Sequence, residues 1–189
     1  ACSIIICSEG VADKLDIPLD KRVYPLASSE NNHMISTLQR PNLIEPAGMQ
    51  LAAKFILDIC SKNNLVPNIY DLYSCFPVAI QMFAKSLNLN NIKDKTVTGA
   101  MPFAGGPLNS YVLHSTAKLI EKLRENNGIG IVTGVSGMMT KQSYALWSKN
   151  KEIDFIHKDV TKDAETIEKA LELSEFEDGE GKIVGYTVI

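Results

Sequence analysis

The sequence has few of the residues that mark metal sites and disulfide frameworks. Its 189 residues include only four cysteines, three histidines and one tryptophan. The cysteines form no Cys-x-x-Cys pair, so neither a zinc cage nor a disulfide framework is indicated. Reduced thiols in the cytoplasm are the simpler interpretation. We therefore expect a cytoplasmic protein without a metal site.

The chain also lacks a long apolar run and an excess of either charge. Its longest β-rich apolar run, Ile4-Ile5-Ile6, is far shorter than the roughly 20 residues that a membrane span needs. The N-terminus has neither the basic region nor the cleavage site of a signal peptide. The formal net charge of −3 gives no electrostatic reason to expect binding to nucleic acid or to an anionic membrane. Neither a membrane span nor a nucleic-acid partner is expected.

The residues that are present describe an ordinary globular protein with one sizeable core. Hydrophobic residues make up 45% of the chain and charged residues 22%, which is a usual balance. Strand and helix patterns alternate over residues 1–150, and this favours an α/β layered fold. Strands are expected at residues 3–7, 22–26, 69–73, 129–133 and 143–147. Helices are expected at residues 9–15, 46–62 and 77–87, and from the 104–107 loop to about Glu125.

The helix expected over residues 46–62 has the clearest pattern. Its apolar residues recur at spacings of three and four, as in a stripe that faces a core: Met49, Ala52, Ala53, Ile56, Ile59 and Cys60. Cys60 is therefore expected to be a small buried residue. A polar stretch, residues 28–40, precedes this helix. It is too long for a plain connection, so we expect a functional or partner-facing loop.

The character of the sequence changes near Asn150. Residues 161–172 predict a charged helix, an acidic turn follows at residues 175–181, and residues 182–189 predict a last strand. We therefore expect a domain of residues 1–150 and the start of a separate small module at residues 151–189. A chain that begins and ends on bare strands exposes two sheet edges. The sequence is accordingly interpreted as a fragment, or as a chain that a second segment completes.

Three segments that contain glycine or turn residues each follow an expected strand. They are Tyr73-Ser74-Cys75-Phe76-Pro77, Gly105-Gly106-Pro107 and Gly134-Val135-Ser136-Gly137. Ligands of open α/β sheets bind outside the carboxyl ends of the strands, so three loops at such ends would share one pocket. Glycine allows close backbone approach, and Pro107 suits the first position of a helix whose free N–H groups suit an oxyanion. Taken alone, each segment also has a purely structural explanation, because turns commonly use Gly and Pro.

The order and spacing of these segments resemble the three carboxyl-terminal active-site loops of the thiolase superfamily. The resemblance covers residues 1 to about 148. The Asn-Glu-Ala-Phe loop of the family, which is His-Asp-Cys-Phe in the sterol-carrier thiolases, is similar to Tyr73-Ser74-Cys75-Phe76. The Gly-His-Pro loop is similar to Gly105-Gly106-Pro107, and the Cys-x-Gly loop to Gly134-Val135-Ser136.

The runs DLYSCFP and GGPLNSYV are closer still to the acetyl-CoA acetyltransferase-like proteins of the thiolase-like type 1 group. That group carries an additional small β-rich domain, which residues 151–189 would begin. The resemblance implies the carboxyl-terminal half of a thiolase: an α/β half-fold with a five-stranded mixed sheet covered by helices. It also implies acyl transfer between coenzyme A thioesters, with acyl-CoA as substrate or ligand and no further cofactor. The implied partner is the amino-terminal half, in the same chain or another, and a homo-oligomer is left open.

The chain departs from the family at the positions that move protons. In thiolases the His of Gly-His-Pro activates a nucleophilic Cys in the other half, and the Cys of Cys-x-Gly transfers a proton. The matching positions here are Gly106 and Gly134, and Tyr73 replaces the Asn that holds an oxyanion-hole water. Glycine has no side chain that accepts or donates a proton, and each lost group costs about 10²–10⁴-fold in rate. We therefore expect an acyl-CoA-binding protein with impaired or absent thiolase catalysis.

The candidate residues fall into two sets. The catalytic candidates are Tyr73, Ser74 and Cys75, and the pocket candidates are Gly105, Gly106, Pro107, Gly134, Ser136 and Gly137. Tyr73 and Ser74 either contact a thioester or are strand-end residues whose hydroxyls are satisfied locally. For Cys75 a structural role is favoured, because no histidine is near it in the sequence. His114 is interpreted as a helix-face residue and not as a base, and no catalytic context is visible for His33 or His157.

Two other functions stay open. A competent acyltransferase that uses a different residue set, such as Tyr73 or Cys75, would catalyse thiolysis of acetoacetyl-CoA. A scaffold or subunit that pairs with a separate amino-terminal half would use the fold only as an interaction surface.

Overall fold

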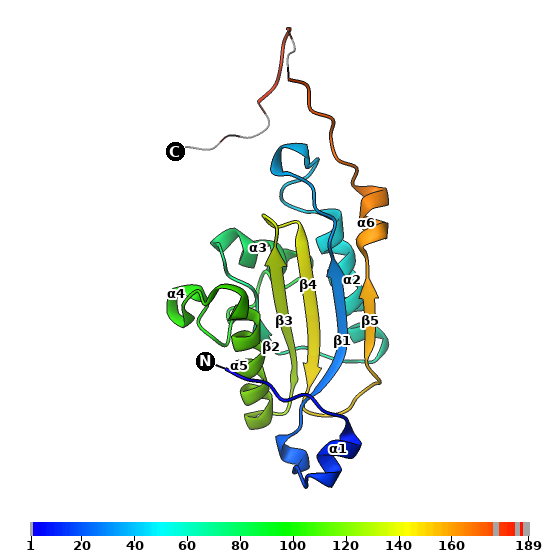
Figure 1. Ribbon diagram of the computed structural model, residues 1–189, viewed down its shortest axis with the longest axis vertical. Coiled ribbons are helices and arrows are strands. Elements are labelled where there is room, and N and C mark those ends of the chain that lie inside the picture. The colour runs from blue at the N-terminus through cyan, green and yellow to red at the C-terminus, as the bar shows by residue number, and fades with distance from the viewer. Residues whose placement is uncertain (1, 176–177, 184–185, 187–189) are drawn as a thin grey trace.

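The computed structural model describes residues 2–175, 178–183 and 186, and it contains a five-stranded mixed sheet (Figure 1). The strands are β1 (Tyr24–Asn31), β2 (Ile69–Asp71), β3 (Ile129–Ser136), β4 (Lys141–Ser148) and β5 (Ile156–Asp159). Their order in the sheet is β2-β3-β4-β1-β5. β4 is antiparallel to β3 and β1, whereas β2 is parallel to β3 and β5 is parallel to β1. The expected fold class is confirmed.

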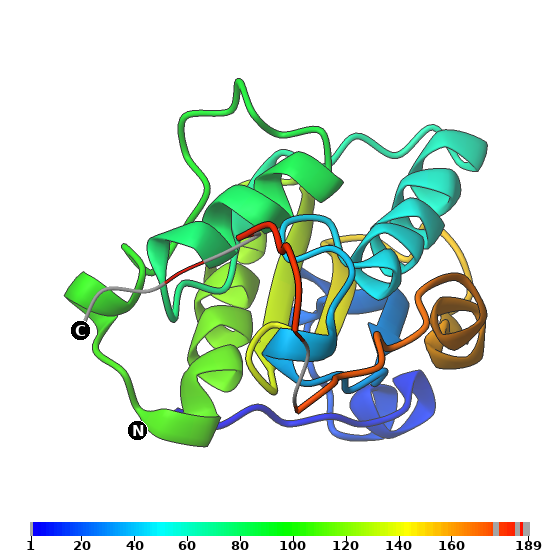
Figure 2. The same cartoon turned by 90° about the horizontal axis from the view of Figure 1, so that it is seen from above.

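The part of the chain that the structure describes forms six α-helices, two of which cover opposite faces of this sheet. The six are α1 (Glu9–Lys14), α2 (Ala47–Lys62), α3 (Pro77–Ser86), α4 (Met101–Ala104), α5 (Tyr111–Glu125) and α6 (Thr161–Ile167). α2 packs on β1 and β4, behind the strands in Figure 1, and α5 packs on β2 and β3 from the other side (Figure 2). Among the described residues, none of the helices combines the length and apolar character needed to cross a bilayer.

The larger core lies between α2, α3 and the sheet. The expected stripe of α2 is buried, with Met49, Ala52, Ala53 and Ile56 fully inaccessible to solvent. Cys60 is buried among the same apolar residues, as expected. Full burial of a large apolar side chain contributes about 1.5–3 kcal/mol, so this face of α2 fixes the helix on the sheet.

β3 is buried on both faces because successive side chains of a strand point to opposite sides. Ile131 joins the core under α2 and α3, whereas Val132 packs with Leu119 and Leu123 of α5. Gly130 also faces α5, and a Cβ there would lie 2.7 Å from the side chain of Leu119. The glycine therefore lets α5 lie close to the strand.

The prediction of a polar loop at residues 28–40 is wrong for residues 28–31, because β1 continues to Asn31. Ser29 donates to the carbonyl oxygen of Ala52 in α2 at 2.7 Å. The side-chain amide of Asn31 donates to Gln142 Oε1 and to the carbonyl oxygen of Thr140, each at 2.8 Å. These bonds satisfy buried polar groups that otherwise disfavour a strand. Only residues 32–40 form the loop, and its partner-facing role stays a prediction.

The expected strand at residues 3–7 is absent: this described segment is an irregular stretch in which Ile5 is 92% and Ile6 86% exposed. The fifth strand is instead β5, which pairs with β1 although its four residues are all exposed. The sheet thus contains residues from both sides of the boundary expected near residue 150. α6 ends at Ile167 and contacts α2 and β1. A module beyond α6 stays a prediction, and most of the strand expected at residues 182–189 lies outside the described residues.

Candidate functional site

The loops after β2 and β3 begin side by side. The two strands are parallel, with Asp71 opposite Val132. Two residues further on, the backbone N–H of Tyr73 donates to Thr133 Oγ1 at 2.9 Å. The Tyr73-Ser74-Cys75 segment and the Gly134 segment therefore leave the sheet at the same edge.

A chain of hydroxyl groups connects this edge to the start of α4 and α5. Ser74 Oγ lies 3.2 Å from Tyr111 Oη, which lies 2.9 Å from Thr98 Oγ1, and Thr98 donates to Asp71 Oδ2 at 2.9 Å. A hydroxyl has one hydrogen. Because Thr98 gives its hydrogen to the carboxylate, Tyr111 donates to Thr98 and Ser74 donates to Tyr111. The backbone N–H of Met101 donates to Ser74 Oγ at 3.0 Å, so α4 starts beside Ser74.

Asp71 anchors this network from inside the protein. The residue is fully buried, and its Oδ2 also accepts hydrogen bonds from Thr96 Oγ1 and from the backbone N–H groups of Val97 and Thr98, at 2.9–3.0 Å. Its Oδ1 has no hydrogen-bond partner among the described residues. Charge-assisted bonds of this kind are about twice as strong as neutral ones. Asp71 therefore holds residues 96–98 against the end of β2.

The two candidate hydroxyls differ in their availability. Ser74 is only 6% exposed and its hydrogen is used within the chain of hydroxyls, so its bonding is satisfied locally. Tyr73 stacks edge-to-face on Tyr111, with ring centroids 5.4 Å apart. Burial raises the pKa of Tyr73, and neighbouring Cys75 and Tyr111 raise it further. Because its pKa is raised, the Tyr73 hydroxyl keeps its proton at neutral pH. Within the described part of the chain this hydroxyl makes no hydrogen bond, so it is free to donate one.

Cys75 is poorly suited to act as a nucleophile. Burial raises the pKa of its thiol, and nearby backbone N–H groups offset this only in part. The thiolate is the reactive form of cysteine, and it is scarce here at neutral pH. Among the described residues no histidine hydrogen-bonds to Cys75. The geometry therefore agrees with a structural role.

Gly105, Gly106 and Pro107 lie in an exposed loop between α4 and α5. A Cβ on either glycine would meet no atom within 4 Å. The space that a side chain at Gly106 would occupy is therefore open. We expected Pro107 to begin the helix, and this prediction is wrong. Pro107 precedes a 3₁₀ turn, Leu108–Ser110, and α5 starts at Tyr111. Leu108 adopts φ of +51° and is 85% exposed. The free N–H groups of α5 therefore lie past this loop.

Gly134 is constrained by packing. A Cβ at this position would lie 2.7 Å from Ser143 Oγ and 3.3 Å from Val112 Cγ2. A side chain here would therefore displace β4 or α5. Ser136 is exposed at the end of β3, and Gly137 starts the β3–β4 turn with φ of +57°. These two candidates therefore lie at the end of β3 and in the turn that follows it.

Comparison with known proteins gives the fold family. No family model and no curated protein matches the sequence. The monomeric SCP2-thiolase-like protein type 1 from Mycobacterium smegmatis matches with a TM-score of 0.65 and 25% identity, over 74% of this chain and 32% of that one. The chain has the fold of the thiolase-like proteins.

Two further thiolases resemble the chain more distantly. Peroxisomal 3-ketoacyl-CoA thiolase of Saccharomyces cerevisiae matches 74% of it and 37% of its own length, at 18% identity and a TM-score of 0.49. The Acat5 thiolase from Ascaris suum matches 76% of this chain and 34% of its own, at 17% identity and a TM-score of 0.43. The chain spans about a third of the length of the thiolase-like proteins that it matches.

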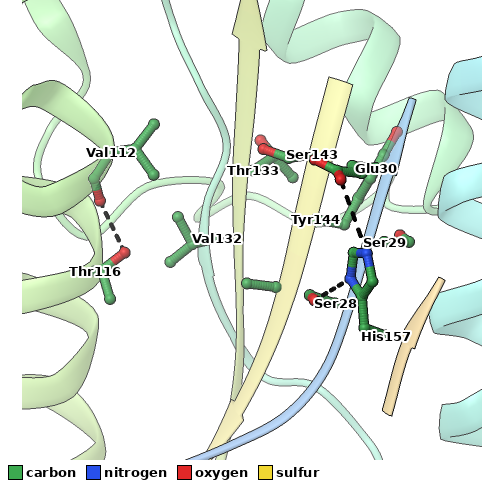
Figure 3. A pocket seen from close by; sticks show the side chains of 11 residues that line it. Ser28, Ser29, Glu30, Val112, Thr116, Val132, Thr133, Ser143, Tyr144 and His157 are labelled. Carbon is green, nitrogen blue, oxygen red and sulfur yellow. Dashed lines mark hydrogen bonds and ion pairs between the residues drawn. The ribbon is translucent and has the colours of Figure 1, made fainter. Parts of the chain in front are cut away.

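A hollow of about 150 Å³ opens on the α5 side of this thiolase-like sheet (Figure 3). On one side it is lined by Val112 and Thr116 of α5 and by Val132 and Thr133 of β3, and of these Val112 and Thr133 adjoin Gly134. Elsewhere it is lined by β1, β4 and β5, where Ser28 Oγ lies 2.8 Å from His157 Nδ1. The sequence predicted no catalytic role for His157. Its neighbours are brought to it by the pairing of β5 with β1, and β5 has no apolar pattern that would predict a strand. Within the described residues, no three potential His, Cys, Asp or Glu ligands cluster as a metal site.

Proposed function

We propose that this chain binds acyl-CoA thioesters as the carboxyl-terminal half of a thiolase-like protein whose ordinary thiolase catalysis is impaired or absent. The main support is the edge where Tyr73, Thr133 and Ser74 join the loops after β2 and β3 to the start of α4. That edge offers backbone groups and the free Tyr73 hydroxyl to a thioester. The similarity to an SCP2-thiolase-like protein supports the same assignment.

The proposed loss of catalysis follows from the side chains at this edge. Gly106 faces open space and Gly134 packs against α5, so neither supplies an acid or a base. Cys75 holds its proton, and the hydrogen of Ser74 is already used. Each missing acid or base removes about 10²–10⁴-fold in rate. Turnover of acyl-CoA by this chain is therefore expected to be near background.

The proposal includes an amino-terminal half, supplied by the same polypeptide or by another chain. It is supported by the coverage of about a third of the related structures. A homo-oligomer and a cytoplasmic location belong to the same proposal. All four cysteines are free thiols, the form that reducing compartments maintain.

Calorimetric titration with acetyl-CoA and with coenzyme A tests the binding. We expect saturable binding at ligand concentrations up to the millimolar range. Tyr73→Phe should weaken it about 2–10-fold, because one neutral hydrogen bond contributes about 0.5–1.5 kcal/mol. Tyr186→Phe, at an exposed position, is the matched control. Absence of saturable binding, or equal affinity of wild type and Tyr73→Phe, would contradict the proposal.

Two assays separate the alternatives. A rate of acetoacetyl-CoA thiolysis well above background that Cys75→Ala abolishes would favour a competent acyltransferase. The subunit alternative has its own support in the exposed side chains of Ile5 and Ile6, which a partner would cover. Size measurement showing a tight hetero-complex, without acyl-CoA binding, would favour that role.

A further inference from the structure

Two strands that are far apart in sequence bring a serine and a histidine together. β1 and β5 are parallel, and Ser28 is directly opposite His157 in their register. Ser28 Oγ lies 2.8 Å from His157 Nδ1. Figure 3 shows both side chains at the hollow, with Glu30 beside the imidazole ring. Ser28, Glu30 and His157 belong to β1 and β5, whereas the loops of the proposed acyl-CoA site follow β2 and β3; the hollow meets that site at Thr133.

Glu30 lies beside the second ring nitrogen of His157, at an ion-pair distance and not within hydrogen-bond reach. Its Oε1 lies 3.8 Å from His157 Nε2. A carboxylate at that place favours the tautomer with hydrogen on Nε2, which leaves a lone pair on Nδ1. Ser28 is then the donor in its bond to Nδ1. A hydroxyl, an imidazole that accepts its hydrogen and a carboxylate that orients the imidazole are the parts of an activated nucleophile.

The hollow gives a small acyl group access to Ser28. Val112 of α5 and Ala145 of β4 contribute apolar wall, and its volume is about 150 Å³. His157 and Glu30 are each nearly half exposed, so the hollow is open to solvent. The carboxylate of Glu30 repels anionic substrates such as coenzyme A esters. The fitting substrates are therefore small, uncharged esters of short-chain carboxylic acids.

We propose that Ser28 and His157 form a nucleophile and general base that hydrolyse such esters, with Glu30 as a positioning residue. Ser28 Oγ bonds the carbonyl carbon while its hydrogen moves to His157 Nδ1. The ester C–O bond breaks, and the leaving alcohol takes that proton. Water, which gives a proton to His157, then attacks the acyl-serine; the carboxylic acid leaves and Ser28 Oγ regains the proton.

Hydrolysis of 4-nitrophenyl acetate by the purified chain tests this activity. Ser28→Ala and His157→Ala should each lower kcat by about 10²-fold or more, as for loss of a nucleophile or a general base. Free imidazole should restore part of the rate in His157→Ala but none in Ser28→Ala. Glu30→Gln should lower kcat while KM is unchanged. Ser61→Ala and His114→Gln, which lie outside the hollow, should match wild type.

Mass spectrometry of the acetylated chain locates the nucleophile. We expect the acetyl group on Ser28, and an adduct there with a fluorophosphonate probe. An adduct on a cysteine instead, or equal rates in wild type and Ser28→Ala, would overturn the proposal. Circular dichroism checks that each variant is folded. If the variants do not fold, fluorophosphonate labelling of wild type decides, and the absence of a Ser28 adduct refutes the assignment.

Discussion

The backbone N–H of Tyr73 donates to Thr133 Oγ1 at 2.9 Å, and this bond joins the loop after β2 to the end of β3. Thr133 is buried, so water cannot easily replace its hydroxyl as the acceptor of this bond. The position of Tyr73 relative to Gly134 thus depends on a side chain in the neighbouring strand.

Replacing that side chain tests the connection. Thr133→Val keeps the shape but removes the acceptor, so the N–H of Tyr73 loses its partner. We expect a loss of about 1–3 kcal/mol in the free energy of unfolding, measured by urea denaturation, together with weaker acyl-CoA binding. Thr166→Val on the exposed side of α6 is the control. Unchanged stability in Thr133→Val would show that the bond is dispensable.

Tyr111→Phe interrupts the chain of hydroxyls in its middle. Ser74 Oγ and Thr98 Oγ1 both lose their contact with the phenol hydroxyl. Because Ser74 is buried, we expect a destabilisation of about 1–3 kcal/mol, measured by chemical unfolding. Tyr186→Phe should leave the unfolding midpoint unchanged. Equal stability of Tyr111→Phe and wild type would show that these two contacts do not stabilise the fold.

Gly134→Ala should be destabilising because its Cβ would lie 2.7 Å from Ser143 Oγ. Crowding of this kind typically costs about 1–3 kcal/mol. In a double-mutant cycle, Ser143→Ala should recover part of this loss, because it removes the atom in conflict. Gly10→Ala, where a Cβ meets no atom within 4 Å, is the control. Strictly additive effects of the two changes would argue against the contact.

Stability above pH 9 should depend on Cys60. Burial raises the pKa of its thiol from 9.0 to about 11. The folded state holds this proton more tightly than the unfolded chain, so the stabilisation is full below pH 9 and is lost as the pH rises towards 11. The difference corresponds to about 2–3 kcal/mol. Cys60→Ala should therefore have a flatter pH dependence of its unfolding free energy than wild type, and parallel curves would contradict this.

Elements with a regular apolar pattern could be predicted from the sequence. The stripe of α2 and the apolar run of β3 follow directly from the spacing of their residues. β5 could not be predicted, because its four residues are exposed and show no apolar pattern. The strand is held in the sheet by backbone pairing with β1. The second half of β1 looked like a loop because Ser29 and Asn31 are polar, and only their bonds to distant residues explain their burial.

The candidate site shows the same limit. The sequence identified the loops at the ends of β2 and β3, because Gly and Pro mark turns after strands. It did not identify Asp71, Thr98 and Tyr111 as one network, because their bonds join residues that are 27 and 13 positions apart in the sequence. It likewise missed the pairing of Ser28 with His157, which are 129 residues apart.

The exposed isoleucines near the amino terminus have a practical consequence for handling this chain. Ile5 and Ile6 lie in an irregular segment, and their exposed side chains offer apolar surface to any strand that meets them. Such a segment invites intermolecular pairing. Light scattering of concentrated samples should therefore report growing particles for wild type, and an Ile5→Lys variant should stay monodisperse because charge interrupts this pairing.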